Sequence, residues 1–353
     1  MTDTDVDLLS PVALAANDPR DMLADALSLP DQLRDAVWKV ESAGLSPWDS
    51  PGGLVFAGMG GSGVGGALAV AAIGDEASRS ISLAQSYELP SWTTPDTTVL
   101  CTSYSGGTEE TLACYEAAGA VGARRIVATT GGELGSLARR DGVPVIPIAG
   151  GLQPRAALGY VFTAAIEVAG LAGVAPRRTP EIDVAAAHLE VLAREWGPNG
   201  PADSEPKQLA RALHGTTPLI YGAGPTRPVA YRWKCQLNEN AKLHAFTHHL
   251  PELDHNELIG WERAAEQAPF GAVFLDDTDL HPRIARRIEV TRDIIGGQAA
   301  ANVLVAPRSG SRVQRLLSLT LLGDLTSIYL AALRGVDPSP IAGIDTLKVA
   351  LAS

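Results

Sequence analysis

The sequence is short of cysteine and of charged residues in general. It has only 3 cysteines among 353 residues, and Cys101, Cys114 and Cys235 form neither a CxxC pair nor a spacing typical of a metal site. Because the number is odd and the chain is large, a disulfide framework is not expected, and we predict a reducing, cytoplasmic compartment. Charged residues make up 19% and hydrophobic residues 46%, which argues against a largely disordered chain.

Basic residues are fewer than acidic ones, 28 against 40, and the formal net charge is −12. Nucleic-acid-binding domains usually present a basic face, so this balance argues against a nucleic-acid partner. Residues 1–7 contain three Asp and no basic residue, unlike a signal peptide. The most apolar long run, residues 316–333, is interrupted by Asp324 and fits a buried helix better than a membrane span. We therefore expect no membrane partner.

At roughly 150 residues per domain the length suggests about two domains. Short apolar runs alternate with helical patterns in both halves, which predicts parallel sheets with helices on both faces. The predicted strands are 54–57, 81–86, 98–101, 125–128 and 144–148, then 218–221, 272–275 and 302–305. The predicted divisions are an N-terminal tail and helices (1–48, the tail loose and acidic to about residue 17), a first α/β subdomain (49–174), a connection (175–206) and a second α/β subdomain (207–353).

Glycine is concentrated in residues 58–66, between a predicted strand and a predicted helix, where Gly58, Gly60 and Gly63 satisfy the pattern GxGxxG. This pattern places backbone N–H groups and a helix N-terminus against a phosphate. A dinucleotide site would also need an acidic residue about 20 positions further on. Position 83 is Leu and Glu88 lies just beyond the next predicted strand, so that alternative is weakened rather than excluded. A tight turn that uses Gly only for close packing also stays open.

Hydroxyl groups dominate the turn after the predicted strand at 98–101. Ser103, Ser105 and Thr108 lie within six residues, and Gly106 and Gly107 allow a tight turn with exposed N–H groups. Short neutral donors at a helix N-terminus suit a phosphate monoester, whereas the simpler alternative is an ordinary hydroxyl N-cap. Two such turns after neighbouring strands are more specific than either alone, because ligands bind at the carboxyl ends of parallel strands.

The Ser-x-Ser-Gly-x-Thr turn resembles the sugar isomerase (SIS) domain, which binds the phosphate of phosphosugars with these hydroxyls. The resemblance implies a phosphosugar ligand. It assigns phosphate binding to Ser103, Ser105 and Thr108, and the sugar side to Gly60, Gly61 and Ser62.

A second group of polar residues follows the predicted helix at 228–242. Glu239 and His255 lie sixteen residues apart, which is too far for one helix face but suits a helix end and the next loop converging on a cleft. A carboxylate and an imidazole are the minimum pair for moving protons on a sugar. Taken singly, a solvated helix-end carboxylate and a capping or core histidine remain the simpler alternatives.

Histidine is also concentrated here, which raises a metal alternative. His244 and His248 have the i, i+4 spacing of a helical ligand pair, with His249 and Glu252 close by. However, Phe246 and the residues after it suggest an extended or loop segment, and an HExxH motif is absent. We therefore expect no bound metal and no cofactor.

Several separated motifs together resemble the bifunctional phosphoglucose/phosphomannose isomerase family, a branch of the SIS superfamily. They are Gly58–Ser62, Ser103–Thr111, Pro154–Tyr160, Asn238–Lys242 and Pro251–Glu257 with Trp261. Gly107, Asp254 and Ala67 stand where the family commonly has Asn, Asn and Asp. The resemblance implies an α/β fold of two SIS-type subdomains, each a parallel sheet flanked by helices, flavodoxin-like and doubly wound.

The resemblance also implies metal-independent aldose–ketose isomerisation of glucose 6-phosphate, mannose 6-phosphate or both with fructose 6-phosphate. His255 would open the sugar ring, Glu239 would carry a proton between C2 and C1, Arg155 would stabilise the developing oxyanion and Lys348 would assist ring opening. It further implies a homodimer in which His255 reaches the partner's active site. The alternatives are a non-catalytic sugar-phosphate-binding regulator and a metal-dependent mannose-6-phosphate isomerase.

Overall fold

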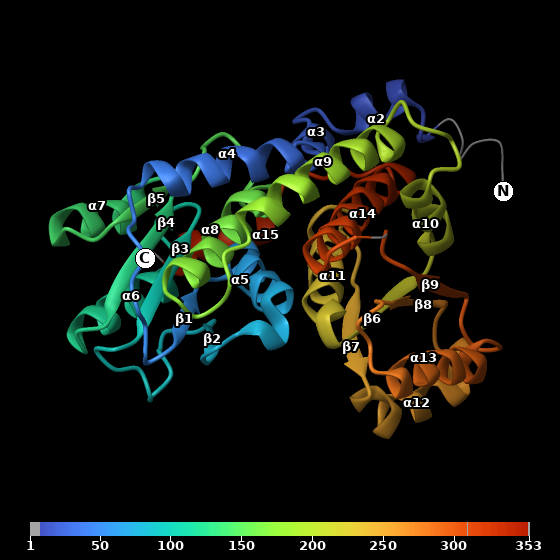
Figure 1. Ribbon diagram of the computed structural model, residues 1–353. Helices are drawn as coiled ribbons and strands as arrows, with labels where there is room; N and C mark the ends of the chain where they lie inside the picture. Colours follow the sequence, from blue (N-terminus) through green and yellow to red (C-terminus); the bar gives the residue numbers. More distant parts are fainter. Residues whose placement is uncertain (1–7, 309, 352–353) are drawn as a thin grey trace. The chain divides into compact units, whose positions relative to one another are not determined.

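The structure is a computed structural model that describes residues 8–308 and 310–351 (Figure 1). The chain forms two compact units, and both are assembled from separate stretches of sequence. The first unit contains residues 28–191 and 308–318, and the second unit contains the N-terminal helices to residue 27, residues 192–307 and the chain from residue 319.

The first unit alternates strands and helices. Its elements are α4 (Leu29–Ser42), β1 (Leu54–Ala57), α5 (Gly60–Ile73), η1 (Gly74–Glu76), β2 (Ile81–Ala84), β3 (Thr98–Ser103), α6 (Glu109–Ala120), β4 (Arg124–Thr129), α7 (Gly132–Asp141), β5 (Val145–Pro147), η2 (Pro154–Ala156), α8 (Leu158–Leu171) and α9 (Thr179–Trp196), which continues into the second unit.

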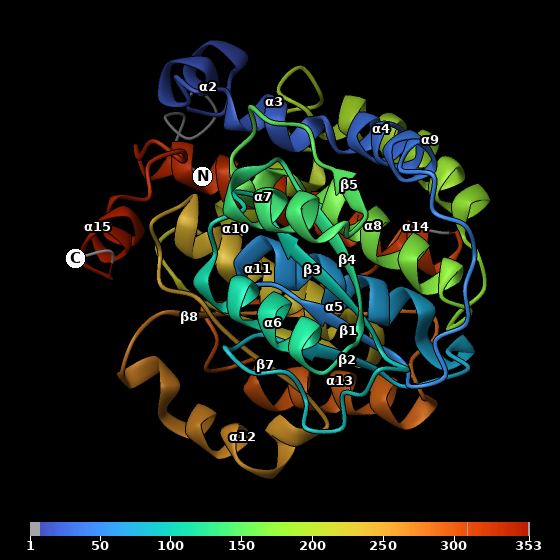
Figure 2. The same cartoon turned by 90° about the vertical axis from the view of Figure 1, so that its left-hand side faces the viewer.

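The first sheet has the strand order β2-β1-β3-β4-β5, and every pairing is parallel. α6 and α7 cover one face, where Cys114, Tyr115 and Leu134 pack against Val99 and Val127 of the strands, and Figure 2 shows both helices in front of this sheet. α5 and α8 pack together as another helical layer. A doubly wound sheet with this order has its switch point between β1 and β3, where ligands bind outside the carboxyl ends.

A close approach of α5 to α8 depends on one glycine. A Cβ at Gly65 would lie 2.4 Å from the Cγ2 atom of Val161, so a larger residue would force the helices apart. The glycines of residues 58–66 therefore serve helix packing as well as the turn itself.

The second unit contains the remaining elements. They are α2 (Pro11–Asn17), α3 (Met22–Leu27), α10 (Glu205–Leu213), β6 (Thr217–Ala223), η3 (Gly224–Thr226), α11 (Arg227–Glu239), β7 (Phe246–Leu250), η4 (Glu252–His255), α12 (Glu257–Gly260), η5 (Trp261–Glu266), β8 (Phe270–Leu275), α13 (Pro282–Ile295), β9 (Ala301–Val305), α14 (Arg312–Leu333, which begins in the first unit) and α15 (Ala342–Leu351).

The second sheet has the order β7-β6-β8-β9 and is also entirely parallel. One apolar cluster combines Tyr221 of β6 and Phe274 of β8 with Leu253 and Trp261 from the segment after β7, and with Ile288 of α13. The same strand-and-helix alternation thus builds both sheets, and the predicted α/β fold with two parallel sheets flanked by helices is confirmed.

One prediction about local structure was wrong and another was confirmed. Residues 11–17, predicted as part of a loose tail, form α2, because the Ser10 hydroxyl accepts a hydrogen bond from the Ala13 N–H at 3.4 Å and Pro11 lies in the first turn. The extended segment expected from Phe246 onward is confirmed, because residues 246–250 form the strand β7 paired with β6, so His244 and His248 do not share a helix face. Residues 1–7 of the predicted tail lie outside the described part of the chain.

The predicted buried helix is confirmed as α14. Among the helices that the structure describes, α14 is the one long and apolar enough to cross a membrane, and its apolar window is entirely buried inside the protein. It is packed tightly, since a Cβ at Gly323 would lie 2.1 Å from the indole nitrogen of Trp233. These features are those of a core helix.

Candidate active site

The glycine-rich turn of the first unit brings two parts of the candidate site together. α5 begins at Gly60, directly after β1, so Gly60, Gly61 and Ser62 form the first turn of the helix rather than a separate loop. A Cβ at Gly61 would lie 3.1 Å from the carbonyl oxygen of Pro154 and 3.4 Å from the Cα atom of Arg155. Glycine at this position therefore allows the segment that carries Arg155 to lie against the N-terminus of α5.

The hydroxyl-rich turn of the first unit is organised by its own side chains. The Ser103 and Thr108 hydroxyls are 2.8 Å apart and hydrogen bonded, and the Gly106 N–H donates to the Ser103 hydroxyl at 3.0 Å. Ser103 is buried, whereas Ser105 is exposed. Thr108 is the N-cap residue of α6 but makes no side-chain capping bond, so its hydroxyl belongs to the turn and not to an ordinary helix cap.

Gly106 is required in this turn for two reasons. Its φ angle is +69°, and a Cβ there would lie 2.0 Å from the carbonyl oxygen of Gly131. Its own carbonyl accepts a hydrogen bond from the Leu134 N–H at 2.8 Å. The turn is thereby fixed against the start of α7, and the N-terminus of α6 is left to face solvent with the partial positive charge of its helix dipole.

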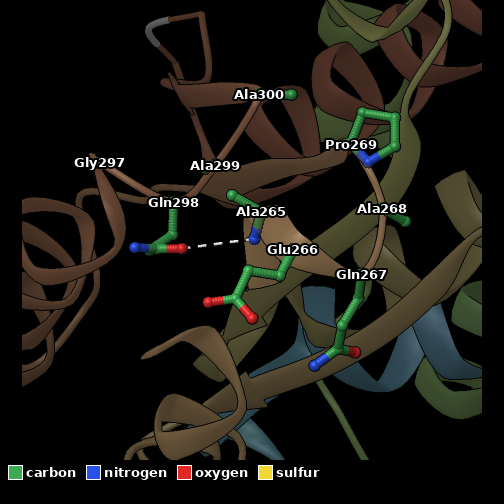
Figure 3. A pocket seen from close by; sticks show the side chains of 9 residues that line it. All are labelled: Ala265, Glu266, Gln267, Ala268, Pro269, Gly297, Gln298, Ala299 and Ala300. Carbon is green, nitrogen blue, oxygen red and sulfur yellow. Dashed lines mark hydrogen bonds between the residues drawn. The ribbon is translucent and has the colours of Figure 1, made fainter. Parts of the chain in front are cut away.

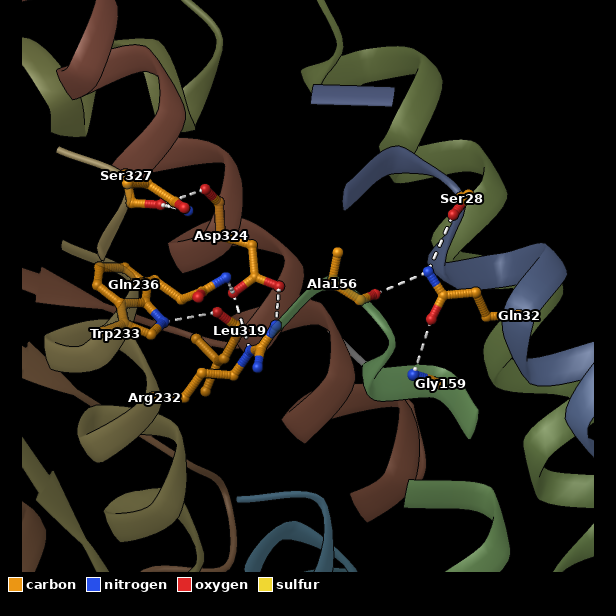
Figure 4. Close-up of polar contacts among 11 residues, drawn as sticks. Ser28, Gln32, Ala156, Gly159, Arg232, Trp233, Gln236, Leu319, Asp324 and Ser327 are labelled. Carbon is orange, nitrogen blue, oxygen red and sulfur yellow. Dashed lines mark hydrogen bonds and ion pairs between the residues drawn. The ribbon is translucent and has the colours of Figure 1, made fainter. Parts of the chain in front are cut away.

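Arg155 is almost fully buried, with 4% of its surface exposed, and its segment is held by α4. The Gln32 side-chain amide donates to the Ala156 carbonyl at 2.9 Å and accepts from the Gly159 N–H at 3.0 Å (Figure 4). The Tyr104 hydroxyl, next to Ser103, accepts from the Leu152 N–H at 2.9 Å. One buried glutamine and one tyrosine thus connect the segment of Arg155 to the rest of the first unit.

Glu239 is the last residue of α11 in the second unit, and the chain around it is anchored to α14. The Asn240 side chain donates to the Ser327 hydroxyl at 2.9 Å, and the Arg334 guanidinium donates to the Ala241 carbonyl at 2.9 Å. Lys242, with a φ angle of 51°, donates through its ammonium group to the Pro338 carbonyl at 3.0 Å. These contacts fix the end of α11 and leave the Glu239 side chain half-buried.

A buried ion pair holds the middle of α11 to α14. Arg232 donates to both carboxylate oxygens of Asp324, at 2.9 Å from Nε and 2.6 Å from a terminal nitrogen, and Gln236 donates to the same carboxylate at 3.0 Å (Figure 4). Burial raises the pKa of Asp324, and the Arg232 guanidinium opposes that effect. Each charge therefore compensates the other within the buried core.

His255 lies at the end of η4, in the turn that follows β7, and its side chain is exposed. The carboxyl end of β7 is paired with the carboxyl end of β6, where Leu250 lies opposite Ala223. His255 thus stands at the carboxyl edge of the second sheet, the edge where ligands usually bind in parallel α/β folds.

Glu239 and His255 do not converge within one chain, contrary to the prediction that a helix end and the next loop would form a cleft. α11 starts after the carboxyl end of β6 and runs back for 13 residues, about 20 Å, so it ends at the amino edge of the sheet. There, the Asn238 side chain accepts from the N–H of Ala245, just before β7. The strand β7 then separates the two residues, and Figure 1 shows α12 past the far end of β7.

Lys348 lies on α15, a helix with no buried residue. In the part of the chain that the structure describes, Lys348 makes no hydrogen bond or ion pair, whether to Glu239, to His255 or to any other residue. The chain before α15 contacts the segment after Glu239 through Pro338, whose carbonyl accepts from Lys242.

The histidine-rich segment lies largely in the strand β7. Among the described residues, no group of three or more His, Cys, Asp or Glu side chains is placed to hold a metal ion. His248 and His249 are consecutive in β7, and the His249 N–H donates to the ring nitrogen Nδ1 of His248 at 2.7 Å. Burial lowers the pKa of His249, with smaller contributions from Arg227 and His248.

A cavity of about 410 Å³ lies elsewhere in the second unit, at the amino ends of β8 and β9 (Figure 3). Its wall is mostly alanine, glycine and backbone, and Gln298 accepts from the Ala265 N–H at 3.3 Å across it. Since Glu266 is its one charged side chain, this cavity offers nothing that would attract a phosphate.

Comparison with known proteins shows the family to which this chain belongs. The family model described as the bacterial phospho-glucose isomerase C-terminal SIS domain matches residues 202–351. A relative from Caldicellulosiruptor bescii, named bifunctional phosphoglucose/phosphomannose isomerase, is 37% identical, and the alignment covers 94% of this chain and 99% of the relative. This chain belongs to the bifunctional phosphoglucose/phosphomannose isomerase family.

The family membership predicted from the motifs is therefore confirmed, but relatives of this family differ in activity. A protein from Sulfolobus acidocaldarius named D-glucosamine-6-phosphate 4-epimerase is 30% identical, covering 67% of this chain and 70% of that protein. The fold is shared more widely. The C-terminal domain of glucosamine-fructose-6-phosphate aminotransferase from Francisella tularensis gives a TM-score of 0.68 at 15% identity, covering 90% of this chain and 98% of that one.

Proposed function

We propose that this protein interconverts glucose 6-phosphate, mannose 6-phosphate or both with fructose 6-phosphate, through an enediolate and without a metal or cofactor. The observation that carries the proposal is the arrangement of the first unit, where two helix N-termini at the switch point lie beside a hydroxyl-rich turn and a buried arginine. These groups suit a sugar phosphate in a family whose named relatives act on such sugars.

Phosphate binding belongs to the hydroxyl-rich turn. The exposed Ser105 hydroxyl, the Thr108 hydroxyl and the N–H groups at the start of α6 supply neutral donors, while the buried Ser103 hydroxyl keeps the turn in shape. Gly60, Gly61 and Ser62, at the start of α5, line the sugar side. Because the protein carries a net charge of −12, capture of a dianion depends on these local donors rather than on long-range attraction.

The chemistry requires four proton-handling or charge-stabilising groups. His255 donates a proton to the ring oxygen as the C1 hydroxyl loses its own, which opens the ring, and Lys348 assists this step. Glu239 removes the C2 proton of the open aldose, giving an enediolate, and returns it to C1, while the proton of the C2 hydroxyl passes to the C1 oxygen. Arg155 stabilises the negative charge that develops on the enediolate oxygen, because a fixed buried cation needs no reorganisation at that moment.

We propose a homodimer in which the partner's His255 completes the site of Glu239. Within one chain the two residues lie at opposite ends of β7, which supports a shared site. His255 is exposed, as a residue contributed to another subunit must be before assembly. Mixing a Glu239→Gln protein with a His255→Ala protein would restore part of the activity if sites are shared, and none if each chain is self-sufficient.

The remaining proposals concern the setting of the enzyme. We propose subdomain limits of 49–174 and 207–353, which enclose the strands of the first and the second sheet, respectively. Residues 1–48 precede them and residues 175–206 connect them. A cytoplasmic location, with neither nucleic acid nor a membrane as partner, agrees with the acidic composition and with the burial of α14.

The decisive experiment is NMR of fructose 6-phosphate with the purified protein in D2O containing EDTA. Formation of glucose 6-phosphate and mannose 6-phosphate, deuterated at C2, is the expected result for a dual isomerase. One product alone would narrow the specificity. The absence of product and of deuterium at C1 would refute the isomerase proposal and favour a regulator that binds sugar phosphates without turnover.

A second candidate follows from the 4-epimerase relative. Glucosamine 6-phosphate is therefore incubated with the protein in a parallel NMR sample. A new C4 epimer in that sample, together with no reaction of fructose 6-phosphate, would assign the protein to the epimerase branch of the family.

A further inference from the structure

The residue before His255 is fixed to α13. The Asp254 carboxylate, 9% exposed, accepts a hydrogen bond from the Arg287 guanidinium at 2.8 Å through one oxygen and from the Thr291 hydroxyl at 2.8 Å through the other. Thr291 is itself buried. Both carboxylate oxygens are therefore used to hold the η4 turn against one helix.

The chain after His255 is fixed to β6. The Tyr221 hydroxyl donates to the Glu257 carboxylate at 2.5 Å, and the Trp261 indole N–H donates to the Tyr221 oxygen at 3.0 Å. Tyr221 is 1% exposed and Trp261 is 4% exposed. Burial raises the pKa of Tyr221, so the phenol keeps its proton and remains the donor to Glu257.

These anchors leave His255 with little freedom except rotation of its own side chain. Asp254 and Glu257 lie one residue before and two residues after it, and Leu253 adds a fully buried apolar contact. Proton transfer is sensitive to position, and a displacement of about 1 Å can slow a reaction by about 100-fold. We infer that Asp254 and Glu257 are positioning residues that aim the exposed imidazole of His255, an inference that rests on its proposed role in ring opening.

A stabilising role alone would not account for the arrangement at Asp254. The Arg287 side chain is 38% exposed and Asp254 is 9% exposed, so solvent screens the ion pair from the Arg287 side and weakens its contribution to stability. The same helix carries the ordinary exposed pair Arg286–Glu289, with side chains 64% and 61% exposed. Loss of the Asp254 contacts should therefore affect the aim of His255 more than the unfolding of the protein.

Ring opening can be measured apart from isomerisation. In a Glu239→Gln background the C2 proton is not removed, yet ring opening followed by closure still interconverts the α and β anomers of glucose 6-phosphate. NMR exchange spectroscopy measures this rate above the spontaneous one. In that background we expect Asp254→Ala to slow anomer interconversion about tenfold, since the turn is no longer held.

The matched variants separate positioning from stability. Asp254→Asn should recover most of the rate, because its amide oxygen accepts from Arg287 and its amide nitrogen donates to the Thr291 hydroxyl. Arg286→Ala should behave like the parent. With Glu239 restored, Asp254→Ala should lower kcat for fructose 6-phosphate with KM within about twofold, because phosphate binding belongs to other residues.

Two results would overturn the inference. One is unchanged anomer interconversion in Asp254→Ala. The other is a loss that Asp254→Asn does not recover and that is accompanied by a matching rise in KM and fall in thermal stability, as general disruption would give. A His255→Ala control distinguishes the proposals. If it leaves anomer interconversion unchanged, the proposed role of His255 fails and this inference fails with it. If it abolishes the exchange and Asp254→Ala does not slow it, only the positioning role fails.

Discussion

Replacing Asp324 by alanine tests whether the buried ion pair between α11 and α14 is held by charge or only by shape. The change removes three hydrogen bonds of 2.6 to 3.0 Å from Arg232 and Gln236 and leaves the guanidinium, 2% exposed, in the core without its carboxylate. Breaking one side of a buried pair typically lowers the free energy of unfolding by about 3–5 kcal/mol. We expect a loss in that range.

The assay is urea denaturation followed by circular dichroism and tryptophan fluorescence, with the urea dependence compared between variants to check that the transition is unchanged in kind. The double variant Arg232→Met with Asp324→Leu is the control. Replacing both partners removes the charges together, so this protein should be within about 1–2 kcal/mol of the parent. A loss below about 1 kcal/mol for Asp324→Ala would show that the pair is not the anchor of α11 and refute the reasoning.

Three further outcomes follow from single sites. Gly106→Ala should raise KM about tenfold or more with a smaller change in kcat, because its φ of +69° and a carbonyl oxygen 2.0 Å from the new Cβ force the phosphate turn to move. Steady-state kinetics would measure this change. An unchanged KM would show that the turn is not part of the site. Lys348→Met should lower kcat and leave the melting temperature unchanged, because the side chain is exposed; unchanged turnover would exclude Lys348. Hydrogen bonds from Arg140 and Tyr115 lower the pKa of Asp141 from 3.8 to about 2. The stabilising effect of its charge is thus full above about pH 4 and is lost toward pH 2, so the melting-temperature gap to Asp141→Asn should close over that window and not at neutral pH.

Local chemistry made much of the fold predictable. Strand 54–57 was placed at its observed bounds, because four apolar residues before a glycine-rich turn are too short for a helix. Five other predicted strands were right in place but too short, as at Thr98–Ser103, since Thr102 and Ser103 look like turn residues in sequence yet pair with β4. The predicted strands 81–86 and 144–148 were longer than the observed Ile81–Ala84 and Val145–Pro147. The buried helix predicted from the apolar run 316–333 is observed as Arg312–Leu333, which begins four residues earlier.

The strand β7 is missing from the predicted strands, and its absence had the largest effect on the predicted site. Thr247, His248 and His249 are polar, so Phe246–Leu250 lacks the apolar run that identified the other strands. Its pairing with β6 is a contact between distant stretches of sequence. Without that strand, Glu239 and His255 look like neighbours across a loop, and their spacing predicts that they converge.

The sequence by itself determined the family, the order of the α/β elements and the residue types at the candidate site, because these depend on motifs and on local turn and helix chemistry. Only the tertiary structure decided that Glu239 and His255 lie at opposite edges of one sheet. It also decided that the segment of Arg155 packs against Gly61 and that Asp254 is hydrogen bonded to α13. The physical reason is that strand pairing, helix direction and buried hydrogen bonds join residues far apart in the chain, and no local pattern records their partners.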